Sequence, residues 1–353
     1  MKKFSSILIA LVLIFSSCTA KITDIGTPVA ESKAMEKFSA YYFDYFDTAT
    51  TIVGYAESKE DFDSACERIT AQLKEYHRLY NIYNRYDGII NMHTVNHSSG
   101  AITVDERIID MLLFAKEAYS LTSGRTNIAM GRVLSLWHSE RTHGESHPES
   151  AKLPDMEKLK EASLYTNIEN LVIDSENNTV TLLDGIKLDV GAVAKGYAVE
   201  MIAKSLEKEG ISGYLLNVGG NVRAVGARPD GTKWSVGIEN PNKTGEDDAF
   251  LAIVAAENEA VVTSGSYQRY YYVNGKAYHH IIDPDTLMPG ENFRSVSIVC
   301  GDSGLGDALS TALFCMSYEE GAKLINSLDG VEAMWVLPNG NIEHSQGFEQ
   351  YLK

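Results

Sequence analysis

The second half of the chain alternates short apolar and β-branched runs with turns built from Gly, Asn and Asp. Turns such as Asp184-Gly185 and Asn274-Gly275 are typical of tight β-hairpins, because these residues adopt positive φ at little cost. Two strands joined by so short a turn run antiparallel. The predicted strands cover residues 171–173, 179–183, 186–190, 215–218, 234–238, 251–255, 260–263, 270–273 and 296–299. The sequence therefore predicts antiparallel sheets as the main scaffold.

Three segments have the spacing of helices. In the first, apolar residues such as Phe62, Ile69 and Leu73 recur every three or four positions, which places them on one face. The third stops at Gly210, a common helix C-terminal residue. The predicted helices cover residues 60–80, 105–121 and 197–209.

Residues 41–55 carry aromatic and β-branched side chains and are predicted as a strand pair or one long strand. With 353 residues the chain has room for two domains, but it contains no internal repeat. We therefore expect an α+β fold of mainly antiparallel sheets with packed helices, in one integrated domain over residues 37–353.

The first seventeen residues have the anatomy of a secretory signal, with a basic start, an apolar run over 6–15 and small residues before Cys18. The small residues before the cysteine are similar to a bacterial lipobox, although Phe15 stands where Leu is usual. The alternative is an ordinary signal cut near Ala20. We expect residues 1–17 to be removed and Cys18 to be lipidated. The protein would then sit on the extracytoplasmic face of the cell membrane, with residues 18–36 as a flexible tether.

The balance of acidic and basic residues limits the kinds of molecule that the protein can bind. The chain has 31 Lys and Arg against 48 Asp and Glu, a formal net charge of −17. Such a chain has no basic surface to neutralise the phosphates of a nucleic acid, so we expect no nucleic-acid partner. To bind an anionic small ligand, such a chain would need a local source of positive potential, such as backbone N–H groups or a metal ion.

The cysteines and one histidine-rich segment point to structure rather than chemistry. Beyond Cys18 an odd set remains, Cys66, Cys300 and Cys315, which does not form a disulfide framework and is predicted to be buried thiols. The polar segment 138–154 carries three histidines, His138, His143 and His147. A solvated loop is favoured there over a metal site.

Two Gly-rich segments lie where a ligand could approach the backbone. In residues 188–198, LDVGAVAKGYA, a predicted strand leads through small residues into a helix whose free N–H groups could meet a phosphate, with Lys195 as a nearby cation. In residues 217–226, NVGGNVRAVG, the paired glycines could approach a ligand, but a tight turn that needs positive φ is the favoured interpretation.

Two further segments carry polar chemistry. Tyr278 to Pro284 contains adjacent histidines, His279 and His280, which point to opposite faces of a strand, so we expect only one to face a site. Residues 304–313 open a helix in which Asp307 and Thr311 are neighbours on one face. Their oxygens suit Mg²⁺. The alternative, in which Asp307 caps its own helix and Thr311 bonds back to its own turn, stays open.

In combination and in this order, these segments resemble the ApbE family, the FAD:protein FMN transferases. The resemblance extends from about Phe46 to Met316. The matching segments are LDVGAVAKGYA (188–198), NVGGN (217–221), TSGSY (263–267), HIIDP (280–284) and DALST (307–311). Family members transfer FMN from FAD to a Thr or Ser hydroxyl of a partner protein as a phosphoester and release AMP.

The resemblance implies the roles of individual residues. His280 would be the general base toward the acceptor hydroxyl. The implied metal site for Mg²⁺ comprises Ala192, through its carbonyl, with Asp307, Ser310 and Thr311. The implied contacts to FAD or its flavin are Phe46, Tyr86, Arg125, Thr126, Asn127, Asp189, Lys195 and Ile281. The implied partners are FAD, an acceptor protein of a membrane redox system, and the lipid membrane reached through Cys18.

Three departures from the family pattern concern the flavin pocket. Asn127 replaces a usual Asp, Phe46-Asp47-Thr48 replaces Met-Gly-Thr, and Leu287 replaces the Gly that follows a Thr. Two alternatives to the transferase remain. One is a Mg²⁺-dependent pyrophosphatase that cleaves FAD to FMN and AMP, and the other is a lipid-anchored flavin-binding protein without turnover.

Overall fold

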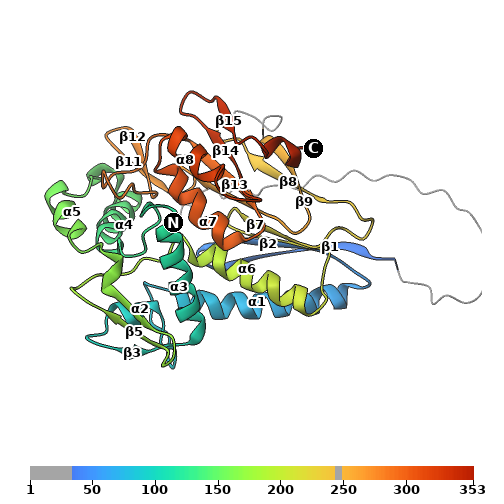
Figure 1. Cartoon of the computed structure of the whole chain (residues 1–353), viewed down its shortest axis with the longest axis horizontal. Helices are drawn as coiled ribbons and strands as arrows, with labels where there is room; N and C mark the ends of the chain where they lie inside the picture. Colours follow the sequence, from blue (N-terminus) through green and yellow to red (C-terminus); the bar gives the residue numbers. More distant parts are fainter. Residues whose placement is uncertain (1–33, 243–248) are drawn as a thin grey trace, which may run out of the picture.

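The computed structural model describes residues 34–242 and 249–353. Its centre is an eight-stranded sheet in the order β1-β2-β6-β7-β10-β13-β14-β15, in which every neighbouring pair is antiparallel (Figure 1). The strands are β1 Glu36–Tyr45, β2 Thr48–Ala56, β6 Tyr214–Val218, β7 Asn221–Val225, β10 Ala260–Gly265, β13 Ser295–Cys300, β14 Glu332–Val336 and β15 Ile342–His344. The predicted α+β fold with mainly antiparallel sheets is confirmed.

Three small antiparallel sheets complete the strand set. They are β3-β5-β4, β8-β9 and β11-β12, with β3 Ile102–Thr103, β4 Leu171–Asp174, β5 Thr179–Leu182, β8 Trp234–Glu239, β9 Phe250–Ala256, β11 Tyr270–Val273 and β12 Lys276–His279. The β11-β12 hairpin turns at Asn274-Gly275, and both residues have positive φ, as that turn sequence predicts.

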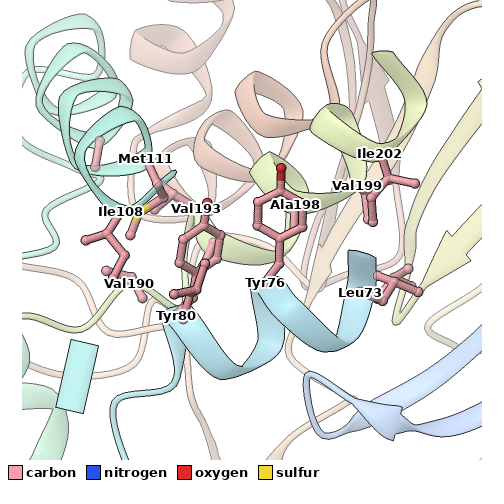
Figure 2. Packing of buried hydrophobic residues seen from close by; sticks show 14 of the residues in the cluster. Leu73, Tyr76, Tyr80, Ile108, Met111, Val190, Val193, Ala198, Val199 and Ile202 are labelled. Carbon is pink, nitrogen blue, oxygen red and sulfur yellow. The ribbon is translucent and has the colours of Figure 1, made fainter. Parts of the chain in front are cut away.

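Four helices of the described residues pack on one face of the main sheet, namely α1 Lys59–Tyr80, α6 Ala194–Lys208, α7 Ser303–Phe314 and α8 Tyr318–Ile325. The other helices described are α2 Met92–Asn96, α3 Glu106–Leu121, α4 Gly131–Ser146 and α5 Met156–Ser163, with short turns η1 Pro148–Ser150, η2 Ile168–Asn170 and η3 Phe348–Tyr351. Of these, α2 packs against β5 and α4 against β11. Helix α1 begins at the N-cap Ser58 and lies alongside α6 (Figure 1). Figure 2 shows Leu73 and Tyr76 of α1 facing Ala198 and Ile202 of α6. These four side chains belong to one buried cluster between the two helices.

The opposite face of the sheet is covered by strands. Side chains alternate along β2, so that Ile52 packs among the helices while Val53 joins a second cluster with Trp234 of β8 and Phe348 of η3. Both faces of the main sheet are therefore buried, and the helical layer holds the α6 and α7 segments that the sequence singled out.

Most of the predicted elements are present. Residues 41–55 belong to a hairpin, β1-β2, and the helices predicted over 60–80, 105–121 and 197–209 appear as α1, α3 and α6. The strand predicted over 186–190 is wrong, because in that segment only Lys187 makes an isolated bridge, to Met130. Gly131 packs against the Lys187 carbonyl there, so the segment lies under α4 rather than in a sheet.

The loop predicted over 138–154 is also wrong at its start. Residues up to Ser146 continue α4, whose inner side buries Val133 and Trp137 beside Tyr271 of β11. The polar residues that suggested a loop form the outer side of this helix. His143 and His147 stack there, and the described residues contain no group of three or more His, Cys, Asp or Glu that could hold a metal.

Predictions for the N-terminus fall on residues 1–33, including the signal segment, Cys18 and most of the tether, and these lie outside the described residues. Within the described part no helix is both long and apolar enough to cross a membrane. Cys66, Cys300 and Cys315 are buried and free, as expected.

Candidate functional site

The loop that leads into α6 meets α7 through the carboxylate of Asp307. Oδ2 of this carboxylate accepts a hydrogen bond from the backbone N–H of Gly196 at 2.8 Å, and Oδ1 lies 3.2 Å from Nζ of Lys195. A Cβ at position 196 would stand 2.4 Å from Cβ of Asp307 and from the Ser303 carbonyl. The helices approach so closely only because residue 196 is glycine. Lys195 and Asp307, 112 positions apart, therefore lie side by side. The sequence analysis assigned Lys195 to FAD and Asp307 to the metal, and those roles stay predictions.

The carboxylate of Asp307 thus caps the start of α6. Gly196 is the third residue of that helix, so its N–H has no carbonyl partner within the helix, and Asp307 provides the acceptor. The carbonyl of Ala192, two residues before the helix, accepts no hydrogen bond from the described residues.

The structure does not show the alternative in which Asp307 caps α7 and Thr311 bonds back to its own turn. The N-cap of α7 is Asp302, whose side chain accepts from Gly304 and Leu305, so Asp307 does not cap its helix. The residue that bonds back to its own turn is Ser310, whose hydroxyl donates to the Asp307 carbonyl at 3.0 Å and also contacts Ser264 at 2.8 Å. The Thr311 hydroxyl makes no hydrogen bond with the described residues.

These residues fit a hard cation. The Asp307 carboxylate, the free Ala192 carbonyl and the free Thr311 hydroxyl are all oxygen donors of the kind that Mg²⁺ prefers. The hydroxyl of Ser310 donates to the Asp307 carbonyl and contacts Ser264, so it also holds this turn of α7 in place. The described residues contain no group of three or more His, Cys, Asp or Glu, so solvent and substrate oxygens would have to complete the coordination of a bound cation.

The adjacent histidines have different tasks. Both ring nitrogens of His279 are engaged, since Nε2 donates to the Gly290 carbonyl at 2.8 Å and Nδ1 accepts from the N–H of Ile281 at 3.2 Å. The ring also packs edge-on against Phe314. His279 therefore shapes the backbone. This agrees with the expectation that only one histidine of the pair faces a site.

His280 keeps one nitrogen free. Its Nδ1 lies 3.3 Å from the Arg269 carbonyl, an acceptor, so Nδ1 carries the proton and the lone pair of Nε2 is available. Burial, together with the nearby charges of Arg269 and Arg141, lowers the pKa of His280 to about 3. The imidazole is therefore neutral at physiological pH, which a general base requires.

Arg269 also joins His280 to the tip of the β1-β2 hairpin. One of its guanidinium nitrogens lies 3.5 Å from the Phe46 carbonyl and 3.3 Å from that of Asp47. Phe46 and Asp47 have φ of 52° and 50°. Asp47 therefore adopts the left-handed conformation for which the family uses glycine, and the turn keeps its shape despite the departure.

The second departure behaves in the same way. Leu287 has φ of 61°, again the left-handed conformation at a position where the family has glycine. Its side chain is buried beside Trp137, and its carbonyl accepts from the Trp137 indole at 2.9 Å. Packing and this hydrogen bond hold a conformation that costs a leucine about 1–2 kcal/mol.

Phe46 and Tyr86, both predicted flavin contacts, each contact His77, a residue that the sequence analysis did not identify. Nδ1 of His77 accepts from the N–H of Phe46 at 3.0 Å, and Nε2 of His77 lies 3.1 Å from the Tyr86 hydroxyl. The ring of His77 also meets that of Phe46 edge-on. Burial lowers the pKa of His77, so it is a neutral bridge that unites Phe46 and Tyr86. Its position in the last turn of α1 carries no motif that could have identified it.

The segment 125–127 is tied down by its own side chains. Arg125 pairs with Asp283 at 3.2 Å, and the Thr126 hydroxyl donates to the Ala308 carbonyl at 2.7 Å. The Asn127 amide donates to the Thr166 carbonyl at 2.9 Å. These residues join the loop before α4 to the HIIDP segment and to α7, so the structure gives them a positioning task.

The side chain of Ile281 points into the core. Its side chain is buried in the cluster under α7, its N–H donates to His279 and its carbonyl accepts from Gly290. The contact with FAD implied at this position would therefore need its neighbours rather than its side chain.

Asp189, an expected FAD contact, lies near two residues of α4 to which the sequence analysis gave no role at a site. Its Oδ1 accepts from the N–H of Gly191 at 2.9 Å, and burial raises the pKa of its carboxyl. His138, which stacks on Tyr83 with ring centroids 4.7 Å apart, and Arg141 lie close enough to influence that pKa. His138 and Arg141 belong to α4. A loop was predicted from residue 138 onward, so the sequence offered no reason to place these two side chains near Asp189.

A shallow hollow of about 480 Å³ lies on the outer side of α4. Its lining residues are His138, Ser139, Thr142, His143, Ser146 and His147. It includes none of Asp307, Lys195 and His280, so it is not the place where the predicted chemistry meets.

Together the fold and these residues define a class of protein. A buried carboxylate beside a lysine and a helix N-terminus suits an enzyme or binding protein for a phosphate-bearing ligand, and the same chain carries a neutral histidine with a free nitrogen. The ApbE family model matches residues 46–335, and the chain belongs to the ApbE family.

Individual relatives agree with this assignment. The chain is 32% identical over 279 residues to an FAD:protein FMN transferase of Treponema pallidum, covering 75% of each chain. It is 28% identical to an enzyme of the same name from Klebsiella pneumoniae, covering 75% of this chain and 83% of the relative. The crystal structure of the ApbE protein from Thermotoga maritima superposes with a TM-score of 0.79 at 28% identity, covering 90% of this chain and all of the other.

Proposed function

We propose that this protein is an FAD:protein FMN transferase, which moves FMN from FAD to a Thr or Ser hydroxyl of an acceptor protein and releases AMP. The observation that carries the proposal is the free Nε2 of a neutral His280, in a chain where Lys195 and the N–H of Gly196 converge on the Asp307 carboxylate. Relatives of that name share most of the chain.

The reaction needs a nucleophile and an electrophile. A hydroxyl is a weak nucleophile, so Nε2 of His280 would take its proton while the oxygen attacks the phosphorus of the FMN half. A P–O bond forms to the acceptor, and the bond to the AMP phosphate breaks. Nδ1–H, held by the Arg269 carbonyl, fixes the tautomer that makes this transfer possible.

The pyrophosphate carries negative charge that repels the attacking oxygen. Lys195 would offset part of this charge, and the N-terminal turn of α6 points its dipole toward it. Asp307, Ala192 and Thr311 would hold Mg²⁺, which when bound supplies a further positive charge to the phosphate oxygens. Phe46 and Tyr86, united by His77, would receive the flavin.

We extend the proposal to the location of the enzyme. Cys18 would be lipidated, so that the enzyme works on the extracytoplasmic face of the cell membrane, and its acceptor would belong to a membrane redox system. The motif at Cys18 supports this location.

The deciding experiment incubates residues 19–353 with FAD and a flavin-acceptor domain, with and without Mg²⁺. We expect AMP and an equal amount of acid-stable fluorescent flavin on the acceptor, only when Mg²⁺ is present. AMP with free FMN and an unlabelled acceptor would instead establish the pyrophosphatase. Bound FAD that is never consumed would establish a binding protein, and the transferase proposal would be wrong.

A further inference from the structure

A buried ion pair lies next to the junction of α6 and α7 and has no part in the chemistry above. Glu200 of α6 and Arg223 of β7 expose only 1% and 4% of their side chains. Nε of Arg223 lies 3.0 Å from Oε2 of Glu200, and Nη2 of Arg223 lies 3.0 Å from Oε1 of Glu207. Glu207 follows Glu200 by about two turns of α6.

The carboxylate of Glu200 also reaches the second helix. Its Oε2 accepts a hydrogen bond from the backbone N–H of Ser303 at 2.8 Å. Ser303 is the first residue of α7, so this N–H has no acceptor within its own helix. Glu200 therefore satisfies a helix end that lies 103 positions away in the sequence.

Ser303 connects this contact to the site. Its hydroxyl donates to the Gly196 carbonyl at 2.7 Å, and its own carbonyl accepts from the Asn221 amide at 3.3 Å. Asp307 lies four residues after Ser303, on the same side of α7. The place of Ser303 against α6 thus decides whether the Asp307 carboxylate can reach the N–H of Gly196.

We propose that Glu200, held in place by Arg223, is a positioning residue for the proposed transferase site. Through Ser303 it sets the approach of α7 to α6, so that the Asp307 carboxylate reaches the N–H of Gly196 and is held at the proposed cation site. The inference rests on the proposed function, because it assigns Glu200 to the cation and pyrophosphate site of that reaction.

A purely stabilising role is a poor explanation of this pair. Replacing both partners of a buried ion pair with apolar side chains of similar volume is often neutral for stability, because the charges lose their hydration on burial. The acceptor that Glu200 offers to Ser303 is a different matter, since no apolar side chain can supply it. Positioning and stability can therefore be separated by choice of variant.

The test uses Mn²⁺ as a probe for the cation, followed by electron paramagnetic resonance, and FAD binding followed by flavin fluorescence. The variants are Glu200→Gln, Ser303→Ala and the double variant Glu200→Met with Arg223→Met. Glu200→Gln keeps an oxygen acceptor for Ser303, whereas the double variant removes the acceptor without leaving a lone buried charge. Lys204→Ala is the matched control, because it removes a charge that contacts Glu200 at 3.5 Å and the α7 N-cap Asp302 at 3.0 Å but leaves the acceptor of the Ser303 N–H in place.

We expect the double variant to stay folded, with a melting temperature lowered only by the unpaired N–H of Ser303, and to bind Mn²⁺ at least tenfold more weakly. Ser303→Ala, a small change that keeps the fold, should weaken Mn²⁺ binding in the same direction. Glu200→Gln and Lys204→Ala should bind as the wild type does.

Wild-type affinity in both the double variant and Ser303→Ala would overturn the positioning role while leaving the transferase intact. Loss of affinity in Glu200→Gln equal to that of the double variant would also overturn it, because charge rather than the acceptor would then matter. A wild-type protein that binds no Mn²⁺ and releases no AMP would instead overturn the proposed function, and the positioning role with it.

Discussion

At the scale of single residues, hydrogen-bond partners separate side chains that the sequence presents as equals. His279 and His280 are neighbours of the same type, yet one has both nitrogens bound to the backbone and the other has a free Nε2. Ser310 and Thr311 are likewise adjacent hydroxyls, and only Ser310 is engaged. Such differences depend on contacts between distant segments, so the sequence could indicate the pairs but not choose within them.

His280→Ala should keep FAD binding and lose transfer by about 10²–10⁴-fold, because it removes the proton acceptor alone. Asp307→Ala should lose both, because it also releases Lys195 and the N–H of Gly196. Fluorescence titration of FAD and an AMP assay measure the two properties. Normal transfer by His280→Ala would remove the assignment of the base.

The low pKa of His280 predicts the pH profile. A base with a lowered pKa stays unprotonated as the pH falls, so kcat/KM of the wild type should stay level from pH 7.5 down to pH 5.5. Arg269→Gln removes a nearby positive charge, raises the pKa of His280 and should move the acid limb to higher pH.

Lys276→Gln is the control for this profile. Lys276 pairs with Glu291 on the β11-β12 hairpin and is absent from the charges that act on His280. An acid limb near pH 6.5 in the wild type, unchanged in Arg269→Gln, would contradict the assignment.

At the scale of elements, two glycine positions show what the backbone requires. Gly196→Ala should destabilise the protein by about 1–3 kcal/mol and weaken FAD binding, because the new Cβ meets Asp307 and the Ser303 carbonyl. Gly301→Ala should be silent, since no atom lies within 4 Å of its Cβ. Thermal melting of both variants measures the difference, and equal melting temperatures would show that α6 and α7 can move apart.

The β1-β2 turn gives a prediction from backbone conformation. Asp47→Gly should be tolerated, because glycine adopts φ near 50° without strain, while Asp47→Val should lower both stability and FAD affinity. Asp47 is exposed, so lost packing is not the cause. Equal FAD affinity in the two variants would show that the turn has no part in the flavin pocket.

Elements with local signals were predictable, and those without were not. The helix α1 and the β11-β12 hairpin follow directly from apolar spacing and from Asn274-Gly275. Helix α4 was missed because its outer side is polar and its buried contacts come from β11, a distant segment. That error also concealed His138 and Arg141, whereas the LDVGAVAKGYA and DALST motifs located the α6-α7 junction from the sequence.

At the scale of the whole molecule, partly buried histidines link stability to pH. Burial lowers the pKa of His77, His138, His279 and His280. Below pH 6.5 the unfolded chain therefore binds more protons than the folded one, and stability falls as the pH falls.

Each extra proton bound by the unfolded chain lowers the free energy of unfolding by about 1.4 kcal/mol per pH unit. Urea unfolding at pH 7.5 and pH 5.5 should show a lower midpoint at pH 5.5, and His77→Gln should reduce the difference. A midpoint that does not change between these pH values would contradict the buried neutral state of the histidines.

The contact between Lys195 and Asp307 joins residues 112 positions apart, and α7 is contributed by the last sixth of the chain. Contacts of such long range form late, because a long loop must close before they are made. A chain that is still emerging during synthesis or export therefore has α6 but not its counterpart. A ligand that needs both helices, as the proposed function requires, can therefore bind only after the chain has been made and folded as far as α7.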